Sequence, residues 1–138
     1  MVDKATLDLI LTNLGSYLTV LRELAAVPRE AFLSNRDKIG NAKYHFVIAI
    51  ECCIDIANHI IASENLRFPK DNADSFTALI ERGILDASDS EPLRAMARFR
   101  NRLIHLYWEV DDSKVYEYLQ RSLVDMERFA RTVASRDW

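Results

Sequence analysis

The segment from Ala42 to Ile61 constrains the fold of this chain more than any other, because it is apolar on almost every side. Its apolar residues are Phe46, Val47, Ile48, Ala49, Ile50, Cys52, Cys53, Ile54, Ile56, Ala57, Ile60 and Ile61. A helix with this pattern lacks a wide face for water and is buried on most sides. Glu51, Asp55 and His59 lie in its middle, where each would be costly in lipid. The pattern therefore predicts a buried helix, with no membrane as a partner.

The chain has 138 residues, of which 49% are hydrophobic, and only three are Gly and three are Pro. This length suits one domain with its own core, and so few turn residues favour helices over a sandwich or barrel. We expect a single all-α domain over residues 1–138. In so small a domain, a helix that is apolar all round is most easily buried against a second copy, which predicts a homodimer.

Local signals place the other helices. A stripe of leucines at spacings of three and four residues predicts a helix over about residues 3–27, which Pro28 ends. Ser34, Asn35 and Asp37 offer caps for the apolar helix, which continues to about Glu64. A shorter helix begins near residues 72–74 and ends before Gly83, a residue suited to the left-handed cap position.

Two more helices follow. Residues 86–90 supply caps for a helix with Pro92 in its first turn, which runs to about Ile104. Residues 108–112 form a connection, and a last helix covers about residues 113–134. Because the connections are short, successive helices should pack antiparallel. The expected fold is an antiparallel up-and-down four-helix bundle with an additional short helix.

Composition also limits the compartment and the partners. Cys52 and Cys53 are adjacent on one helix and point in different directions, so they are interpreted as buried thiols in a reducing compartment. The N-terminus shows no secretory signal, which leads us to expect the cytoplasm. A net charge of −3 is unlike that of a general nucleic-acid binder. The exception is one cluster without any acid, formed by Arg94, Arg98, Arg100 and Arg102.

The stretch from Arg100 to Tyr107 carries groups suited to phosphodiester chemistry. A 2′-hydroxyl that attacks its own phosphate needs a group that moves a proton, which His105 can do near neutral pH. It also needs a fixed positive charge for the phosphorane oxygens, which the Arg100 guanidinium supplies. Asn101 would orient the phosphate or the imidazole. This chemistry requires no metal and no other cofactor.

The same residues resemble the Arg-x4-His-x-Tyr signature of the HepT-like ribonuclease toxins, a branch of the HEPN superfamily. The matching positions are Arg100, His105 and Tyr107, and Asn101 matches the polar residue that follows the arginine. Similar segments occur in the same order along most of the chain, at residues 32–37, 50–61 and 79–85. The resemblance implies a HEPN-like bundle that forms a homodimer.

The resemblance also implies function and regulation. It implies a metal-independent endoribonuclease toxin, with RNA as substrate and a cognate nucleotidyltransferase antitoxin of the MNT type as partner. This antitoxin would silence the nuclease by transferring AMP units to Tyr107, which adds phosphate charge and bulk beside the site. Arg98 and Arg102 are the candidates for contacts with the RNA backbone, and solvated helix surface is the alternative for both.

Helix geometry complicates this site. On a straight helix, positions 100 and 105 lie about 140° apart, whereas Asn101 and His105 are aligned. Arg100 and His105 can share one phosphate only if the helix ends or distorts near residues 104–106, if Arg100 reaches around, or if two copies meet across a dimer cleft. We expect the helix to end near residues 104–106.

Glu51, Asp55 and His59 recur every four residues and form a polar stripe on the apolar helix. One interpretation makes them support for the active cleft, where they would position Arg100 or His105. A second is a hydrogen-bonded stripe at a helix or subunit interface. A third is a metal site, for which no third strong ligand is evident, so we predict no metal-binding residues.

Two further functions stay open beside the nuclease. The chain could be a non-catalytic helical dimer that binds a partner or a nucleotide and carries a vestigial Arg-His motif. It could also be a metal-dependent enzyme of the carboxylate-bundle type. The response of RNA cleavage to EDTA and to substitution of Arg100 and His105 separates the three.

Overall fold

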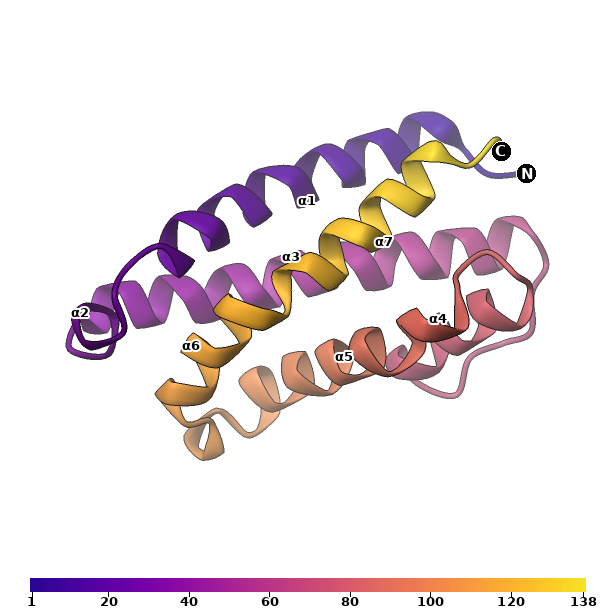
Figure 1. Ribbon diagram of the computed structural model, residues 1–138. Helices are drawn as coiled ribbons and strands as arrows, with labels where there is room; N and C mark the ends of the chain where they lie inside the picture. The colour runs from indigo at the N-terminus through magenta and orange to yellow at the C-terminus, as the bar shows by residue number, and fades with distance from the viewer.

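The computed structural model describes all residues, 1–138, as helices and connecting segments, without a strand. Four helical segments run alternately up and down, and both termini lie at the same end (Figure 1). They are α1 (Lys4–Ala25), α3 (Arg36–Ser63), α5 (Ser90–His105) and the pair α6 (Asp112–Arg121) and α7 (Leu123–Ser135). The short elements are α4 (Asn72–Glu81), α2 (Arg29–Leu33) and the 3-10 turns η1 (Ala87–Asp89) and η2 (Tyr107–Glu109). The predicted all-α up-and-down bundle with an additional short helix, α4, is confirmed.

Several helix ends lie where local signals predict them. The Asn35 side chain accepts a hydrogen bond from the Lys38 amide at 3.1 Å and so caps α3. Asp71 caps α4 by accepting from the Asp74 amide at 2.7 Å. Gly83 follows α4 with a φ of +77°, the left-handed conformation that glycine adopts without steric cost. These ends depend on residues close in sequence, which is why the sequence predicts them.

Two features differ from the prediction. The five residues of α2 form a separate short helix after Pro28. Because this helix is shorter than two turns, no periodic pattern in the sequence predicts it. The predicted last helix, over about residues 113–134, is divided at Ser122 into α6 and α7. The break redirects the chain, so that Tyr116 of α6 packs on Phe32 of α2, with ring centroids 5.3 Å apart, while α7 lies along α1.

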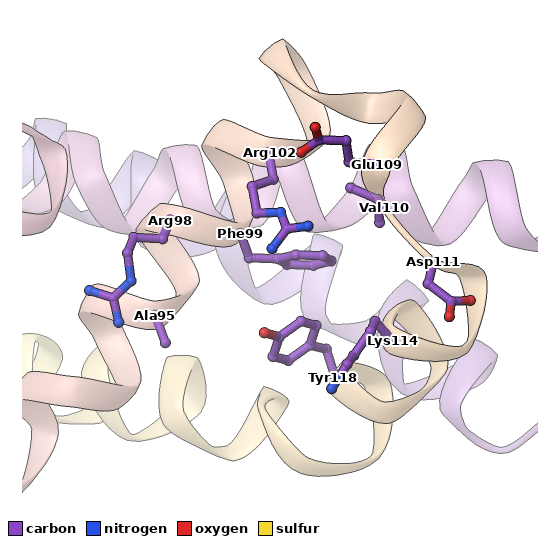
Figure 2. Close-up of a pocket in the computed structure, with 9 residues that line it drawn as sticks. All are labelled: Ala95, Arg98, Phe99, Arg102, Glu109, Val110, Asp111, Lys114 and Tyr118. Atoms are coloured by element: carbon purple, nitrogen blue, oxygen red, sulfur yellow. The ribbon is translucent and has the colours of Figure 1, made fainter.

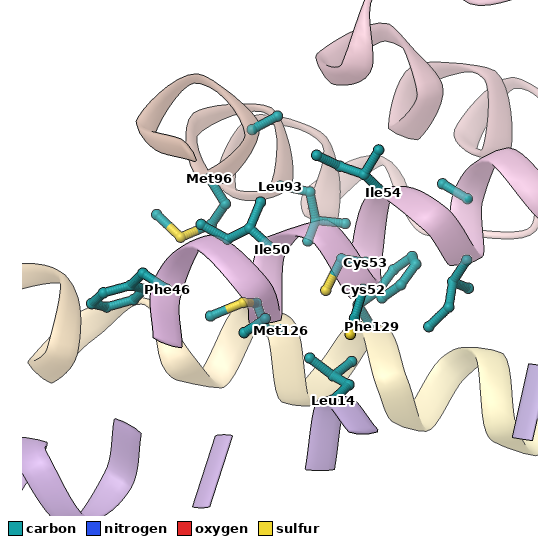
Figure 3. Packing of buried hydrophobic residues seen from close by; sticks show 14 of the residues in the cluster. Leu14, Phe46, Ile50, Cys52, Cys53, Ile54, Leu93, Met96, Met126 and Phe129 are labelled. Carbon is teal, nitrogen blue, oxygen red and sulfur yellow. The ribbon is translucent and has the colours of Figure 1, made fainter. Parts of the chain in front are cut away.

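The central helix of the bundle is α3, which contacts α1, α2, α4, α5, α6 and α7. Its apolar residues within 46–61 are buried except for Val47 and Ile48. Figure 3 shows how Phe46, Ile50 and Cys53 meet side chains from α5 and α7, including Met96 and Phe129. The prediction of a buried helix is confirmed.

The expectation that α3 needs a second copy of the chain for its burial was wrong. The apolar circumference of α3 is covered by the chain's own helices, so its burial does not require a second subunit, and the homodimer stays a prediction on other grounds. By length and hydropathy alone, α3 would also pass for a membrane span, with a mean hydropathy of 1.7 over its most apolar window. The same burial marks it as the core helix of this bundle.

Both thiols of α3 are free and buried, as predicted. Burial raises the pKa of Cys52 to about 11, and the nearby charges of Asp55 and Glu51 add to this effect. Burial also raises the pKa of Cys53 well above its usual range. Neither side chain is a thiolate near neutral pH, so both act as apolar packing groups.

Candidate active site

Helix α5 ends at His105, within the range predicted from the sequence. Leu106 leaves the helical conformation with φ −134° and ψ 38°, although its amide still donates to the Arg102 carbonyl at 2.9 Å. The chain then forms the single turn η2, which begins at Tyr107. His105 is therefore the last helical residue, and its side chain is exposed to solvent.

Arg100 points inward across the bundle to α3. Its guanidinium donates through Nε to Oε1 of Glu51, with Nη2 in ion-pair contact with the same oxygen. A third nitrogen, Nη1, donates to Oδ1 of Asn101 at 2.9 Å. The Arg100 side chain is only 18% exposed and that of Glu51 is 32% exposed. Glu51 therefore fixes the position of a half-buried positive charge.

The other two residues of the polar stripe, Asp55 and His59, have different surroundings. Partial burial raises the pKa of the Asp55 carboxyl, the negative charge of Glu51 raises it further, and the positive charge of Arg100 opposes both. This places Asp55 in the same electrostatic cluster as Glu51 and Arg100. His59 is separate from that cluster, because its Nε2 accepts a hydrogen bond from the Asp3 amide at 3.2 Å, at the start of α1.

Asn101 and His105 do not form the contact that their spacing allows. The Asn101 side chain accepts from Arg100, and no hydrogen bond links it to His105. The angular separation of about 140° between Arg100 and His105 persists, since α5 is helical through both residues. Within one copy of the chain, the guanidinium and the imidazole thus lie on different faces of α5.

His105 shares its face of α5 with two arginines. Arg98, Arg102 and His105 are spaced by four and three residues, which places them in one row along the helix. All three are exposed. Arg98 pairs with Glu91 on the same helix, whereas Arg102 has no carboxylate within ion-pair distance. Arg102 is thus the free cation of this row.

A pocket of about 520 Å³ lies beside this row, between α5, η2 and the start of α6. Figure 2 shows Arg102 and Phe99 on one side of it, with Tyr118 and Lys114 opposite. The rings of Phe99 and Tyr118 contact each other in a tilted arrangement, with centroids 4.3 Å apart. Glu109 of η2 and Asp111 also line the pocket. The pocket combines an aromatic surface with charges of both signs.

The sequence motif did not identify Lys114 and Tyr118 as candidate site residues. They lie outside the segment from Arg100 to Tyr107, and one lysine and one tyrosine on an amphipathic helix carry no local signal of their own. Only the packing of α6 against the end of α5 brings them beside Arg102. A search for positively charged residues one to two turns after the motif would have found Lys114 but not Tyr118.

Tyr107 and Trp108 project from the bundle at this end. Their rings contact each other edge to face at a centroid distance of 5.3 Å, and the residues are 65% and 66% exposed. With Ile104 and Leu106, each 38% exposed, they form an apolar surface around the end of α5. An exposed apolar cluster of this kind is typical of a contact site with another molecule.

The metal alternative for Asp55 and His59 requires a further ligand. No group of three or more His, Cys, Asp or Glu side chains in this chain is arranged to hold a metal ion. Asp55 belongs with Glu51 and Arg100, while His59 binds the start of α1. The two side chains that share the predicted spacing are therefore engaged with different partners.

Known proteins are similar to this chain in sequence and in fold. An mRNA nuclease HepT from Shewanella oneidensis is 38% identical over 79 residues, which are 57% of this chain and 59% of that protein. A tRNA nuclease HepT from Aphanizomenon flos-aquae is 21% identical over 97% of this chain and 91% of its own length. The aligned part thus spans somewhat under two thirds of the Shewanella protein.

A solved structure agrees in fold. It contains a tri-AMPylated Shewanella oneidensis HEPN toxin in complex with an MNT antitoxin, and the toxin chain is 24% identical. The two folds superpose with a TM-score of 0.87 over 94% of this chain and 97% of that chain. The family described as ribonuclease HepT-like matches residues 14–133, a range that includes Glu51, Arg100 and Tyr107. The chain therefore belongs to the ribonuclease HepT-like family.

Proposed function

We propose that this protein is an endoribonuclease of a toxin–antitoxin system that cleaves RNA without a metal ion. The observation that carries the proposal is the family match over residues 14–133, which spans the whole segment from Arg100 to Tyr107. The names of two relatives, an mRNA nuclease and a tRNA nuclease, support the same class of substrate. They do not agree on the kind of RNA, so the proposal is limited to RNA as a class.

In this proposal His105 moves the protons of the reaction. The 2′-oxygen bonds to the adjacent phosphorus as the bond from phosphorus to the 5′-oxygen breaks. His105 either takes the proton of the 2′-hydroxyl, with water protonating the departing 5′-oxygen, or protonates that oxygen while water takes the hydroxyl proton. The products are a 2′,3′-cyclic phosphate and a free 5′-hydroxyl. The open position of His105 at the end of α5 supports this role, because a substrate can approach the imidazole from solvent.

Arg100 stabilises the negative charge that develops on the phosphorane oxygens. Glu51 is a positioning residue that holds the guanidinium, and Asp55 tunes the local charge beside it. Asn101 orients the guanidinium through its contact with Nη1. Donors on Nη1 and Nη2 that do not face Glu51 or Asn101 remain for a phosphate, since the guanidinium carries five N–H donors.

A homodimer completes the site in this proposal. Arg100 and His105 lie on different faces of α5, so a single copy presents only one of them to a given phosphate. The proposed contact between two copies is at the exposed apolar surface of Ile104, Leu106 and Trp108, so that His105 of one copy and Arg100 of the other face a shared cleft. The exposure of this apolar surface in the isolated chain supports the pairing.

Tyr107 is the proposed site of silencing. A cognate nucleotidyltransferase antitoxin of the MNT type would transfer AMP units to its phenol, which is exposed at the mouth of the site. The added phosphates would repel RNA and block entry to His105. The tri-AMPylated HEPN toxin with its MNT antitoxin is the precedent in a similar fold. Such a system would act on RNA in the cytoplasm, where we place this protein.

The test is cleavage of RNA by purified protein in EDTA, beside Arg100→Ala and His105→Ala. We expect each variant to lose at least about 100-fold in rate, because each removes a group that acts in the transition state. Two matched controls, Arg131→Ala on α7 and His45→Ala on α3, should cleave at the wild-type rate. Removal of any nucleotidyl groups with a phosphodiesterase precedes the assay.

The alternative function is a non-catalytic dimeric module with a vestigial motif. The pairing of Arg100 with Glu51 favours it, because a guanidinium whose charge a carboxylate already compensates attracts a phosphate less strongly. Lack of cleavage by the unmodified wild type on any RNA would support this alternative and contradict the nuclease. Cleavage that depends on added metal would contradict the proposed chemistry instead.

A further inference from the structure

We propose that the pocket between α5, η2 and α6 binds one nucleotide of an RNA strand, with the base against Tyr118 and the phosphodiester on Arg102 and Lys114. This inference rests on the proposed function and adds a binding site to it. The pocket, of about 520 Å³, has room for a nucleotide unit. Arg98 and Arg102 line the pocket and share their face of α5 with His105, the proposed acid–base group.

The charge of the pocket suits one phosphodiester. Arg98, Arg102 and Lys114 give three positive charges, against two negative charges from Glu109 and Asp111. The side chains that line the pocket therefore carry one net positive charge, which favours an anionic group over a neutral one.

The side chains differ in how free they are. Asp111 is engaged as the cap of α6, where it accepts from the Ser113 amide at 3.0 Å, and this hydrogen bond lowers its pKa. Arg98 is engaged with Glu91. Lys114 lies 3.4 Å from Glu117 and stays 63% exposed, and Arg102 has no acidic partner. Arg102 and Lys114 are therefore the cations that an incoming phosphate can recruit.

Tyr118 provides the surface for a base. Its ring is held by Phe99, a buried residue, at a centroid distance of 4.3 Å, and Figure 2 shows the ring and hydroxyl within the pocket. Tyr116, two residues earlier, donates its hydroxyl to the Val27 carbonyl at 2.8 Å. The hydroxyl of Tyr118 forms no hydrogen bond within the protein. A ring fixed from behind and open in front is suited to stacking with a nucleobase.

The same nucleotide chemistry could come from RNA or from an AMP unit attached to Tyr107, which begins the turn that lines the pocket. The experiment therefore uses Tyr107→Phe as its background, because this variant cannot carry the modification. The probe is a fluorescent single-stranded oligonucleotide with 2′-O-methyl groups, which cannot be cleaved because the attacking hydroxyl is blocked. Binding is measured by fluorescence anisotropy at low salt.

In this background, Arg102→Gln and Tyr118→Leu should each raise Kd at least about fivefold, the loss expected for one phosphate contact or one stacked base. Tyr118→Phe keeps the ring and should recover most of the affinity that Tyr118→Leu loses. Arg131→Gln and Tyr116→Phe are the matched controls and should also leave Kd unchanged. Circular dichroism checks that Tyr118→Leu is folded. If Tyr118→Leu does not fold, Arg102→Gln still tests the proposal, because Arg102 is exposed.

Unchanged binding in Arg102→Gln would overturn the proposal, as would equal losses in Arg131→Gln. If Arg102→Gln leaves Kd unchanged in the Tyr107→Phe background and lowers Kd in protein that carries AMP on Tyr107, the pocket holds the attached nucleotide and its assignment to RNA is wrong. A wild type that binds the probe through Arg102 and Tyr118 but never cleaves RNA would refute the nuclease and leave the pocket assignment standing. The two failures are therefore distinguishable.

Discussion

The two faces of α5 use positive charge in opposite ways. On the inner face Arg100 is mostly buried and is held by Glu51 of α3 and by its neighbour Asn101. On the outer face Arg98, Arg102 and His105 form an exposed row beside an open pocket. The inner charge is fixed before any substrate arrives, whereas on the outer face Arg102 has no carboxylate partner and can move toward a substrate.

This difference follows from solvation. A charge that loses water on folding needs a partner, since an unpaired buried charge costs several kcal/mol. An exposed pair such as Arg98 with Glu91 changes stability little, because water and salt screen it. The inner face should therefore govern stability and the geometry of the site, and the outer face should govern binding and its dependence on salt. Four predictions test this division, in order of decreasing effect.

The largest effect on the free energy of unfolding is expected at Phe99, a core residue of α5 that also lines the pocket. The Phe99 ring packs on Phe46 of α3 and on Tyr118 of α6, with distances between ring centroids of 5.3 Å and 4.3 Å. Phe99→Ala should lower the free energy of unfolding by about 3–5 kcal/mol, because it leaves a cavity in the core. Urea denaturation measures this loss. Phe68→Ala, at a residue that is 91% exposed, should change it by no more than about 0.5 kcal/mol, and equal losses in the two variants would contradict the assignment of Phe99 to the core.

The second prediction compares the two ion pairs directly. Glu51→Gln should lower the free energy of unfolding by about 1–2 kcal/mol, since it leaves Arg100 poorly compensated. Glu91→Gln, the matched change in the exposed pair with Arg98, should stay within about 0.5 kcal/mol. Thermal and urea unfolding at one salt concentration give both values. A larger loss in Glu91→Gln would reverse the assignment of the inner and outer faces.

The third prediction concerns salt. If Arg102 contacts one phosphate, Arg102→Gln should reduce the slope of log K against log salt by about 0.7 for a single strand. Arg98→Gln should reduce it less, because Arg98 already pairs with Glu91. Titrations of the 2′-O-methyl oligonucleotide between about 50 and 200 mM salt measure these slopes. A smaller change for Arg102 than for Arg98 would identify Arg98 as the contact.

The smallest effect is a dependence of stability on pH. The pKa of Asp55 is raised in the folded chain, so folding favours the protonated carboxyl. As pH rises from the usual Asp range through the raised value, this residue therefore costs stability. Asp55→Asn should be more stable than the wild type at pH 7, and the gain should vanish at acidic pH below both pKa values. A gain that persists there would point to packing instead of charge.

Much of the fold was predictable because its signals are local. The caps at Asn35 and Asp71, the glycine at position 83 and the apolar circumference of α3 each depend on neighbours within a turn or two. The division at Ser122 was not predictable in this way. It is set by where α6 meets α2 and α7 meets α1, and these contacts are remote in sequence.

The candidate site shows the same limit. Helical periodicity gave the separation of Arg100 from His105 and the shared face of Arg98, Arg102 and His105. Periodicity does not predict which of several polar residues on α3 contacts Arg100. The structure shows that Glu51 does, whereas His59 contacts the Asp3 amide. The pocket residues Lys114 and Tyr118 come from a helix that follows the motif, so no spacing within the motif reveals them.

The sequence by itself determined that this chain is helical, that α3 is the buried centre and that one segment carries arginine, histidine and tyrosine at the spacing of the ribonuclease HepT-like family. The tertiary structure decided which charges are paired, which are free and where an open pocket lies. The physical reason is that periodicity and capping act over one or two helical turns, whereas desolvation and pairing of a charge depend on the helix packed against it.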